Sequence, residues 1–366
     1  MKPPFPALLL SIYILCIPSI KAFAQGNKKD IPVLQNPFTV SYIQENLSAS
    51  KPRMIYNDQI LERLKDKIET DPVIGNLYEA IRMDAFEILD LRLIERIKTT
   101  NAMLDVSREL LRRVNLLGVV YLVERDPVIL ERINQELLAT SRFTDWNPPV
   151  YLDVAEICMA VSLALDWTLD DLPESTVLKA KEALIEKGIY PSWEEYGGDK
   201  RHVWWVDHYN NWNQVCNGGM IAASLAIAED DPELAAKTIR RSLDGLPNVL
   251  CSYMPEGIYP ESPMYWEYGT SYSILTLSML ETAFGSDFGH RDYPGFMESA
   301  MYKYMTSTLP SGMYYNFADC KDRPEVDGDM VLAWFATQTG KGMYYDAKKF
   351  LTPARDIRLG YLSGAA

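Results

Sequence analysis

Three stretches of the chain repeat one pattern: a long apolar segment, a short acidic turn that contains a proline, and a more charged segment. The turns lie at Asp126-Pro127, Leu172-Pro173 and Asp231-Pro232. Proline in the first turn of a helix loses no hydrogen bond, and an acidic residue near it can cap the helix. Each stretch therefore predicts a helical hairpin whose apolar helix is buried and whose charged helix faces water.

Repeated hairpins of this kind stack on one another and share a core. The hydrophobic periodicity elsewhere is also helical, and few runs alternate with the period of two that strands show. We therefore expect an all-α fold, an (α/α) toroid built as an incomplete barrel of helical hairpins. The expected helices span residues 58–70, 75–98, 104–124, 127–140, 151–168, 174–187, 212–229, 232–247, 266–284 and 294–308.

Residues 1–24 have the pattern of a secretory signal peptide. One lysine precedes an apolar run, and Ala22-Phe23-Ala24 forms a cleavage site before Gln25. No later stretch is long and apolar enough to span a membrane. We expect the mature protein in the periplasm or outside the cell.

The formal net charge of −14 argues against nucleic acid as a partner. The stretch "GGDKRHVWW" gathers Lys200, Arg201 and His202, which form either a local basic patch for an acidic ligand or an ordinary solvated loop. No metal-binding spacing and no cofactor motif occurs. Four cysteines lie far apart within helical patterns and are expected to be free thiols: Cys158, Cys216, Cys251 and Cys320.

Two loops are rich in aromatic residues, one at 190–214 and the other at 253–272. Tryptophan and tyrosine near helix ends can stack on sugar rings, because their faces are apolar and their edges carry polar groups. The same residues could instead plug the ends of a helical barrel. Because the chain has two such loops, we favour a carbohydrate-binding groove with stacking surfaces at Trp204, Trp205, Trp212 and Trp266.

Three segments carry a family resemblance: "NNWNQVCNGGMIAASLAIAEDDPELA" from 210, "PEGIYPESPMYWEYGTSYSILTLSMLETAFGSDFG" from 255 and "SGMYYNFADC" from 311. They resemble the heparinase II/III family of polysaccharide lyases, over most of residues 100–350. The resemblance implies a toroid at 51–350, followed in the family by β-sandwich domains. Residues 25–50 are then an extended N-terminal segment, and 351–366 begin a linker toward a sandwich that this chain lacks.

The resemblance also implies an activity, the cleavage of uronic-acid polysaccharides by β-elimination without a cofactor. Such a reaction needs a base for the C5 proton, a donor that stabilises the carboxylate, and an acid for the leaving oxygen at C4. The matching motifs place the donor at Asn211, with Asn210 as its neighbour. They place the proton-moving phenol at Tyr265, with Tyr259 as the alternative. A catalytic phenol is expected to have a lowered pKa.

Two departures from the family pattern concern histidine. Trp212 stands where some related lyases have a histidine, so an imidazole would have to come from His202 or His208. The family takes a further catalytic histidine from its β-sandwich, which we expect to be missing from this chain. Glu261 is expected to order its loop rather than to react.

Two other functions stay open. A glycoside hydrolase on the same toroid would need two opposed carboxylates, for which the candidates are Glu256, Glu261, Glu267 and Asp319. A carbohydrate-binding protein would need the groove without the chemistry. The sequence fixes neither the particular polysaccharide nor the oligomeric state.

Overall fold

The computed structural model describes residues 31–168, 171–307, 310–324, 330–345 and 347–365, so the expected signal peptide lies outside the described residues. The described part of the chain from Pro32 onward forms one compact unit. Within it there is no strand, only an isolated bridge between Thr99 and Ala102. None of the described helices has the length and apolar character needed to cross a membrane.

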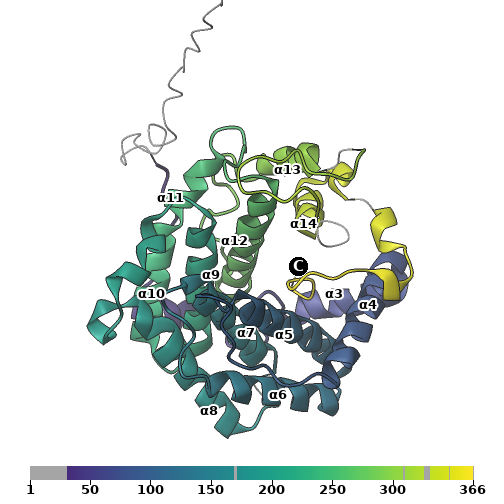
Figure 1. Cartoon of the computed structure of the whole chain (residues 1–366). Helices are drawn as coiled ribbons and strands as arrows, with labels where there is room; N and C mark the ends of the chain where they lie inside the picture. The colour runs from purple at the N-terminus through teal and green to yellow at the C-terminus, as the bar shows by residue number, and fades with distance from the viewer. Residues whose placement is uncertain (1–30, 169–170, 308–309, 325–329, 346, 366) are drawn as a thin grey trace, which may run out of the picture. The chain divides into compact units, whose positions relative to one another are not determined.

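The three predicted hairpins are all present. Four inner helices pack side by side, α5 (Leu104–Glu124), α7 (Tyr151–Thr168), α9 (Asn211–Ile227) and α12 (Pro263–Phe284) (Figure 1). Helices α6 (Pro127–Ser141), α8 (Glu174–Ala183) and α10 (Pro232–Gly245) return on the outside, each after its proline turn. The prediction of an all-α toroid is therefore confirmed.

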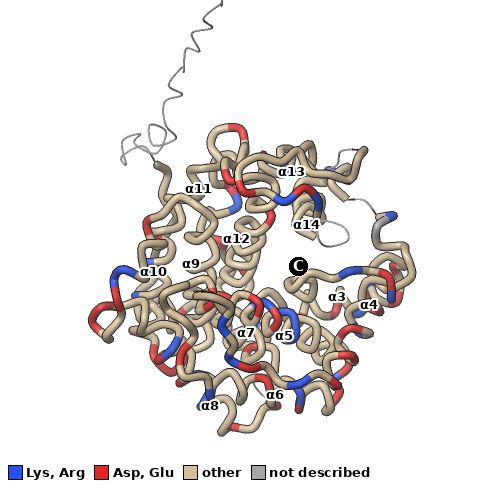
Figure 2. The backbone as a smooth tube through the Cα atoms, in the orientation of Figure 1, with Lys and Arg blue, Asp and Glu red and all other residues tan. Residues whose placement is uncertain are grey.

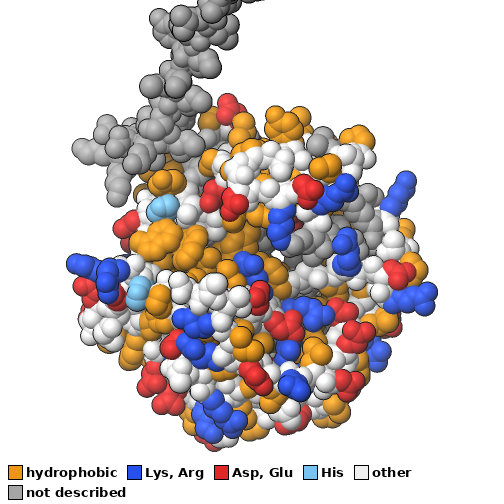
Figure 3. Space-filling view, in the orientation of Figure 1, with side chains coloured by type: hydrophobic (Ala, Val, Ile, Leu, Met, Phe, Trp, Pro, Cys, Tyr) orange, Lys and Arg blue, Asp and Glu red, His pale blue; other side chains and the backbone are white. Residues whose placement is uncertain are grey.

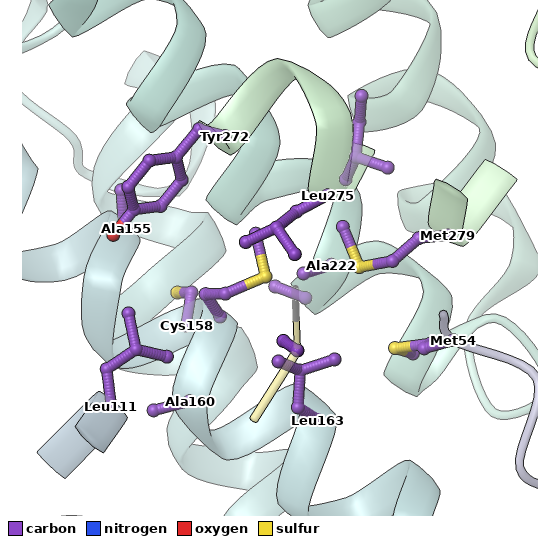
Figure 4. Close-up of a cluster of buried hydrophobic side chains, with 14 of the residues drawn as sticks. Met54, Leu111, Ala155, Cys158, Ala160, Leu163, Ala222, Tyr272, Leu275 and Met279 are labelled. Carbon is purple, nitrogen blue, oxygen red and sulfur yellow. The ribbon is translucent and has the colours of Figure 1, made fainter. Parts of the chain in front are cut away.

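The inner helices are buried almost all round. Every residue of α7 is buried, and Figure 4 shows Leu111 of α5, Leu163 of α7, Ala222 of α9 and Leu275 of α12 meeting in one cluster. Helix α9 contains no charged residue, whereas the outer α8 and α10 carry many (Figure 2). This division matches the prediction that the apolar member of each hairpin is inside.

The ring is completed by segments from both ends of the unit. Helices α3 (Asp58–Thr70) and α4 (Pro72–Leu89) pack beside α5, and α13 (Ser299–Ser307) and α14 (Met330–Thr339) pack beside α12. The short helices η9 (Ala347–Phe350) and η10 (Ala354–Asp356) contact α4, where Asn76 Nδ2 donates to the carbonyl oxygens of Phe350 and Thr352 at 2.6 and 2.7 Å. The following residues turn into the middle of the ring (Figure 1).

Both expected flanking segments differ from the prediction. Residues 351–365 pack within the unit instead of leaving it as a linker, because their backbone is held by side chains of α4 and of the inner helices. Residues 25–50 are not wholly extended, since α2 (Val40–Asn46) forms behind the capping hydroxyl of Thr39.

One predicted helix, 75–98, is wrong at its end, because α4 stops at Leu89. The buried side chain of Arg132 donates to the carbonyl oxygens of Leu89 and Leu91 at 3.0 and 2.8 Å. Its ion-pair partner Glu136 accepts the backbone N–H of Ile94 at 3.0 Å. These tertiary contacts replace the helical hydrogen bonds, and periodicity cannot reveal them.

The cysteines of the described part are free, as predicted. Cys158 and Cys216 are fully buried, and burial raises the pKa of both thiols. A thiol that stays protonated is a poor nucleophile, so these two residues are core packing.

The contact between α7 and α9 requires a glycine. A Cβ on Gly219 would lie 2.5 Å from the carbonyl oxygen of Ala155. We predict that Gly219→Ala destabilises the fold by about 1–3 kcal/mol through overpacking. Urea unfolding should reveal this loss. Gly342→Ala is the control, because no atom lies within 4 Å of the added methyl group. Equal stability of the two variants would contradict the close packing.

Candidate active site

Glu261 joins the two aromatic loops at the start of α9. Its Oε2 accepts the backbone N–H of Asn211 at 2.7 Å, and its Oε1 accepts Asn211 Nδ2 at 2.9 Å. The first N–H groups of a helix lack partners within the helix, and negative charge is favourable there. The side chain of Asn210, the residue before α9, makes no capping bond. The cap therefore comes from the second loop, and Glu261 orders the loops as expected.

Tyr259 supports the same carboxylate from inside the protein. Its hydroxyl lies 2.8 Å from Glu261 Oε2 and 3.0 Å from Gln214 Oε1. The ring is fully buried, and burial together with the charge of Glu261 raises the pKa of the phenol. The prediction of Tyr259 as the alternative catalytic phenol is therefore wrong, because a substrate cannot reach a fully buried hydroxyl.

The residue between Glu261 and the start of α12 has a strained backbone conformation. Ser262 has φ of +109° and is fully buried. Residues other than glycine seldom adopt such angles, and they do so where the surroundings hold them. Tyr265 follows in the first turn of α12. Asn211 and Tyr265 thus lie at the same end of the ring, on either side of Glu261.

Tyr265 is partly buried, and its hydroxyl donates to Asp319 Oδ2 at 3.2 Å. Burial raises the pKa of this phenol, the charges of Asp319 and Glu261 raise it further, and Arg108 opposes them. The expectation of a lowered pKa was therefore wrong. At neutral pH the phenol holds its proton, so its available chemistry is that of a proton donor.

A cleft of about 410 Å³ opens beside Tyr265. Arg108, Lys321 and Arg323 line it together with Tyr268, Tyr314 and Tyr361. In Figure 3 basic side chains lie around the centre of the molecular face, with acidic side chains among them. Glu267 also lines the cleft, but it is paired with Lys303. In a chain with a net charge of −14, the three cations of the cleft favour an anionic ligand.

Arg108 is fixed in this cleft by a buried acid. Its Nε lies 3.3 Å from Oε1 of the fully buried Glu156, which also accepts the hydroxyl of Tyr268 at 2.7 Å. The guanidinium lies 5.2 Å from the ring centre of Tyr268 and 5.7 Å from that of Tyr361. A held guanidinium presents a planar fork of donors that matches a carboxylate.

Sequence analysis missed Arg108, although one sign was present. Glu156 interrupts the apolar run "YLDVAEICMAVSLALDW". An acid on a helix that is buried all round needs a partner, and a search for its cation would have led toward the neighbouring inner helix.

Part of the predicted aromatic surface is present at the rim. The Trp204 side chain is 42% exposed, and its ring centre lies 4.9 Å from that of Trp212 and 4.8 Å from that of His208. His208 stands three residues before Asn211, the first residue of α9, which places this group beside the start of that helix. Trp204, Trp212 and His208 therefore form an aromatic group at the start of α9, and they do not line the cleft beside Tyr265.

Trp205 and Trp266 are wrong predictions, because both are fully buried. The ring of Trp205 packs on Tyr151 at 4.9 Å, and that of Trp266 packs near Phe335 at 5.7 Å. They fill the core beneath the loops, in agreement with the alternative interpretation that the aromatic residues plug the end of the helical barrel.

The predicted basic patch at Arg201 and His202 is largely neutralised by its own loop. Arg201 is well exposed and pairs with Asp199, whose pKa it lowers, and His202 Nε2 lies 4.0 Å from the same carboxylate. The cations of the cleft come from other segments.

The carboxylates considered for hydrolysis have other contacts. Glu261 caps α9, and Glu267 forms an ion pair with Lys303 at 2.5 Å and accepts the hydroxyl of Tyr314 at 3.1 Å. Glu256 lies exposed in a turn, and Asp319 accepts from Tyr265. Because both Glu261 and Glu267 are engaged in these contacts, neither is an obvious reacting acid for hydrolysis.

No family model and no curated protein matches this chain. Solved structures do. An alginate lyase from Bacteroides ovatus matches with a TM-score of 0.58 at 14% identity, over 84% of this chain and 97% of that chain. A tyrosine-to-phenylalanine variant of alginate lyase A1-III complexed with tetrasaccharide matches with a TM-score of 0.55 at 12% identity, over 89% of this chain and 98% of that chain.

At such identities the likeness shows the fold. The chain has the helical toroid found in these polysaccharide lyases. The heparinase II/III family in particular receives no support from these matches, which are to alginate lyases.

The cap at α9 can be tested apart from any activity. Glu261→Ala leaves the Asn211 N–H and the Tyr259 hydroxyl without this acceptor, which we predict costs about 1–3 kcal/mol of folding free energy. Thermal unfolding of this variant should be compared with that of Glu256→Ala, a control at an exposed position. If both variants melt like the wild type, Glu261 does not join the loops.

Proposed function

We propose that this protein is a polysaccharide lyase that cleaves a uronic-acid polysaccharide by β-elimination. The observation that carries the proposal is the position of a phenol, Tyr265, at a cleft lined by three cations in an otherwise acidic protein. Uronic-acid polymers are polyanions, so the cleft suits them better than it suits neutral polymers. The shared toroid of the alginate lyases supports the same function.

In this proposal Arg108 binds the uronate carboxylate, whereas Asn211, which is buried and donates to Glu261, holds the start of α9 and does not touch the substrate as the sequence had predicted. The donors of Arg108 stabilise the negative charge that develops when the C5 proton leaves. His208, three residues before Asn211, is the imidazole that we assign as the base. The C5–H electrons form the C4–C5 double bond, the C4–O bond breaks, and Tyr265 protonates the leaving oxygen. Asp319 orients the phenol through their hydrogen bond.

Three further points belong to the proposal. The string from Tyr259 to Thr270 supports kinship with heparinase II/III lyases. The proposal rests on the toroid alone, which matches one alginate lyase over 97% of that chain. The N-terminal pattern supports export to the periplasm or beyond the cell.

The decisive experiment incubates the protein with alginate and other uronic-acid polysaccharides. Elimination creates a double bond conjugated with the carboxylate, which absorbs ultraviolet light, and it also creates a reducing end. We expect both to appear together. Reducing ends without absorbance would show the hydrolase alternative, and binding without either would show the carbohydrate-binding alternative.

The phenol is tested by removing one oxygen atom. Tyr265→Phe should lower kcat/KM by about 10²–10⁴, the usual contribution of general acid–base catalysis. Tyr259→Phe is the matched control, because its buried ring is kept away from substrate; it should lose stability rather than most of its rate. An unimpaired Tyr265→Phe enzyme would remove Tyr265 from the mechanism.

The pH profile identifies the direction of proton transfer. Asp319 raises the pKa of Tyr265, so Asp319→Asn should lower it. If Tyr265 is the acid, activity falls as pH rises through its pKa, and the variant should lose activity at a lower pH than the wild type. A shift on the acidic limb instead would mean that Tyr265 acts as the base. An unchanged profile would contradict both roles.

A further inference from the structure

The middle of the ring contains two cavities separated by one segment of the chain. The cleft beside Tyr265 has a volume of about 410 Å³, and a second cavity has about 450 Å³. Both are lined by Ser271 of α12, by Met330 and Val331 of α14, and by Leu362. Residues 360–363 line the first cavity, whereas Leu362 and Ala365 line the second. The segment 360–365, called the floor segment below, thus lies between them.

The floor segment is held by side chains of two other elements. The hydroxyl of Tyr56 donates to the carbonyl oxygen of Gly364 at 2.7 Å, and Asn115 Nδ2 donates to that of Tyr361 at 3.2 Å. Gly364 lies so close to α5 that a Cβ would be 2.3 Å from the carbonyl oxygen of Asn115. The floor segment is therefore a firmly held part of the wall between the two cavities.

The distance from the phenol to this wall is short. Tyr265 and Ser271 stand six residues apart on α12, which corresponds to about 9 Å along the helix axis. Tyr361 of the floor segment also packs beside the guanidinium of Arg108. A saccharide that enters past Tyr265 and Arg108 meets the floor segment after a short distance.

We propose that the floor segment makes the cleft blind, so that the enzyme acts on the end of a polysaccharide chain and releases a short product. This inference rests on the proposed function and adds its mode of action. A polymer cannot continue through a closed channel, whereas a chain end can enter it. Leu362 and Gly364 then determine product length without touching the reacting atoms.

The second cavity would come into use only if the floor segment moved. It is lined by the amides of Asn57, Gln59 and Gln338 and by the ring of Trp334, with hydroxyls from Ser271 and Ser278. Amides, hydroxyls and an indole ring are compatible with a sugar chain. Opening the floor would therefore lengthen the saccharide site along α12.

The test compares viscosity with absorbance during digestion of a long alginate. An end-acting enzyme raises the absorbance while the viscosity stays high, and its products are short from the first time point. An early collapse of viscosity, with long products, would overturn the inference and leave the proposed function intact. No absorbance on any uronic-acid polysaccharide would overturn the proposed function itself.

Variants of the floor segment sharpen the test. Leu362→Ala removes part of the shared wall, and Gly364→Ala pushes the segment away from α5. We expect each to increase several-fold the loss of viscosity per unit of absorbance, and to lengthen the products. Gly342→Ala, at an open position, should leave both unchanged. Should Gly364→Ala unfold by circular dichroism, the milder Leu362→Ala decides; a folded Leu362→Ala enzyme with wild-type products would overturn the inference.

Discussion

The complete burial of α7 is the constraint on which the rest of the structure depends. A helix with no exposed residue must be covered on all sides, and α5 and α9 flank it while the outer helices close the remainder. Its buried acids must also find donors. Asp166 accepts the backbone N–H groups of Arg53 and Met54, both at 2.8 Å, and so fixes the approach to α3. Glu156 holds Arg108 and thereby brings a cation into the cleft. One buried helix thus sets both the ring and the charge at its centre.

The fold was largely predictable, because the proline turns and the apolar periodicity are local features. The helices expected at 58–70, 104–124 and 151–168 have those bounds in the structure. What could not be predicted depends on contacts distant in sequence: the early end of α4 under Arg132, the unexpected α14, and the closure of the ring by η9 and η10. Local patterns carry no information about partners that lie 43 residues away, as Leu89 does from Arg132, or 274 residues away, as Phe350 does from Asn76.

The candidate site, like the fold, was predictable only in part. The family resemblance singled out Asn211 and Tyr265, and Glu261 lies between them in the structure, bonded to Asn211. The sequence could not tell which tryptophans of a loop face water, since that depends on how the loop folds over the core, so Trp205 was wrongly assigned to the surface. It also could not give the environment of the phenol, because Asp319 raises the pKa of Tyr265 from a different loop. Residue types were visible in the sequence, whereas burial and charge required the assembled ring.

The closure of the ring has a consequence for how the protein reaches its native state. Each hairpin contacts its neighbours in sequence, and local contacts of this kind form fast. The bonds from Asn76 to Phe350 and from Tyr56 to Gly364 instead join residues separated by 274 and 308 positions. The entropy lost in closing such loops must be met before these contacts contribute stability. The helical hairpins should therefore condense first, and the floor of the cleft should form as a late step of folding. Recovery of a complete cleft would then lag behind recovery of helical structure during refolding.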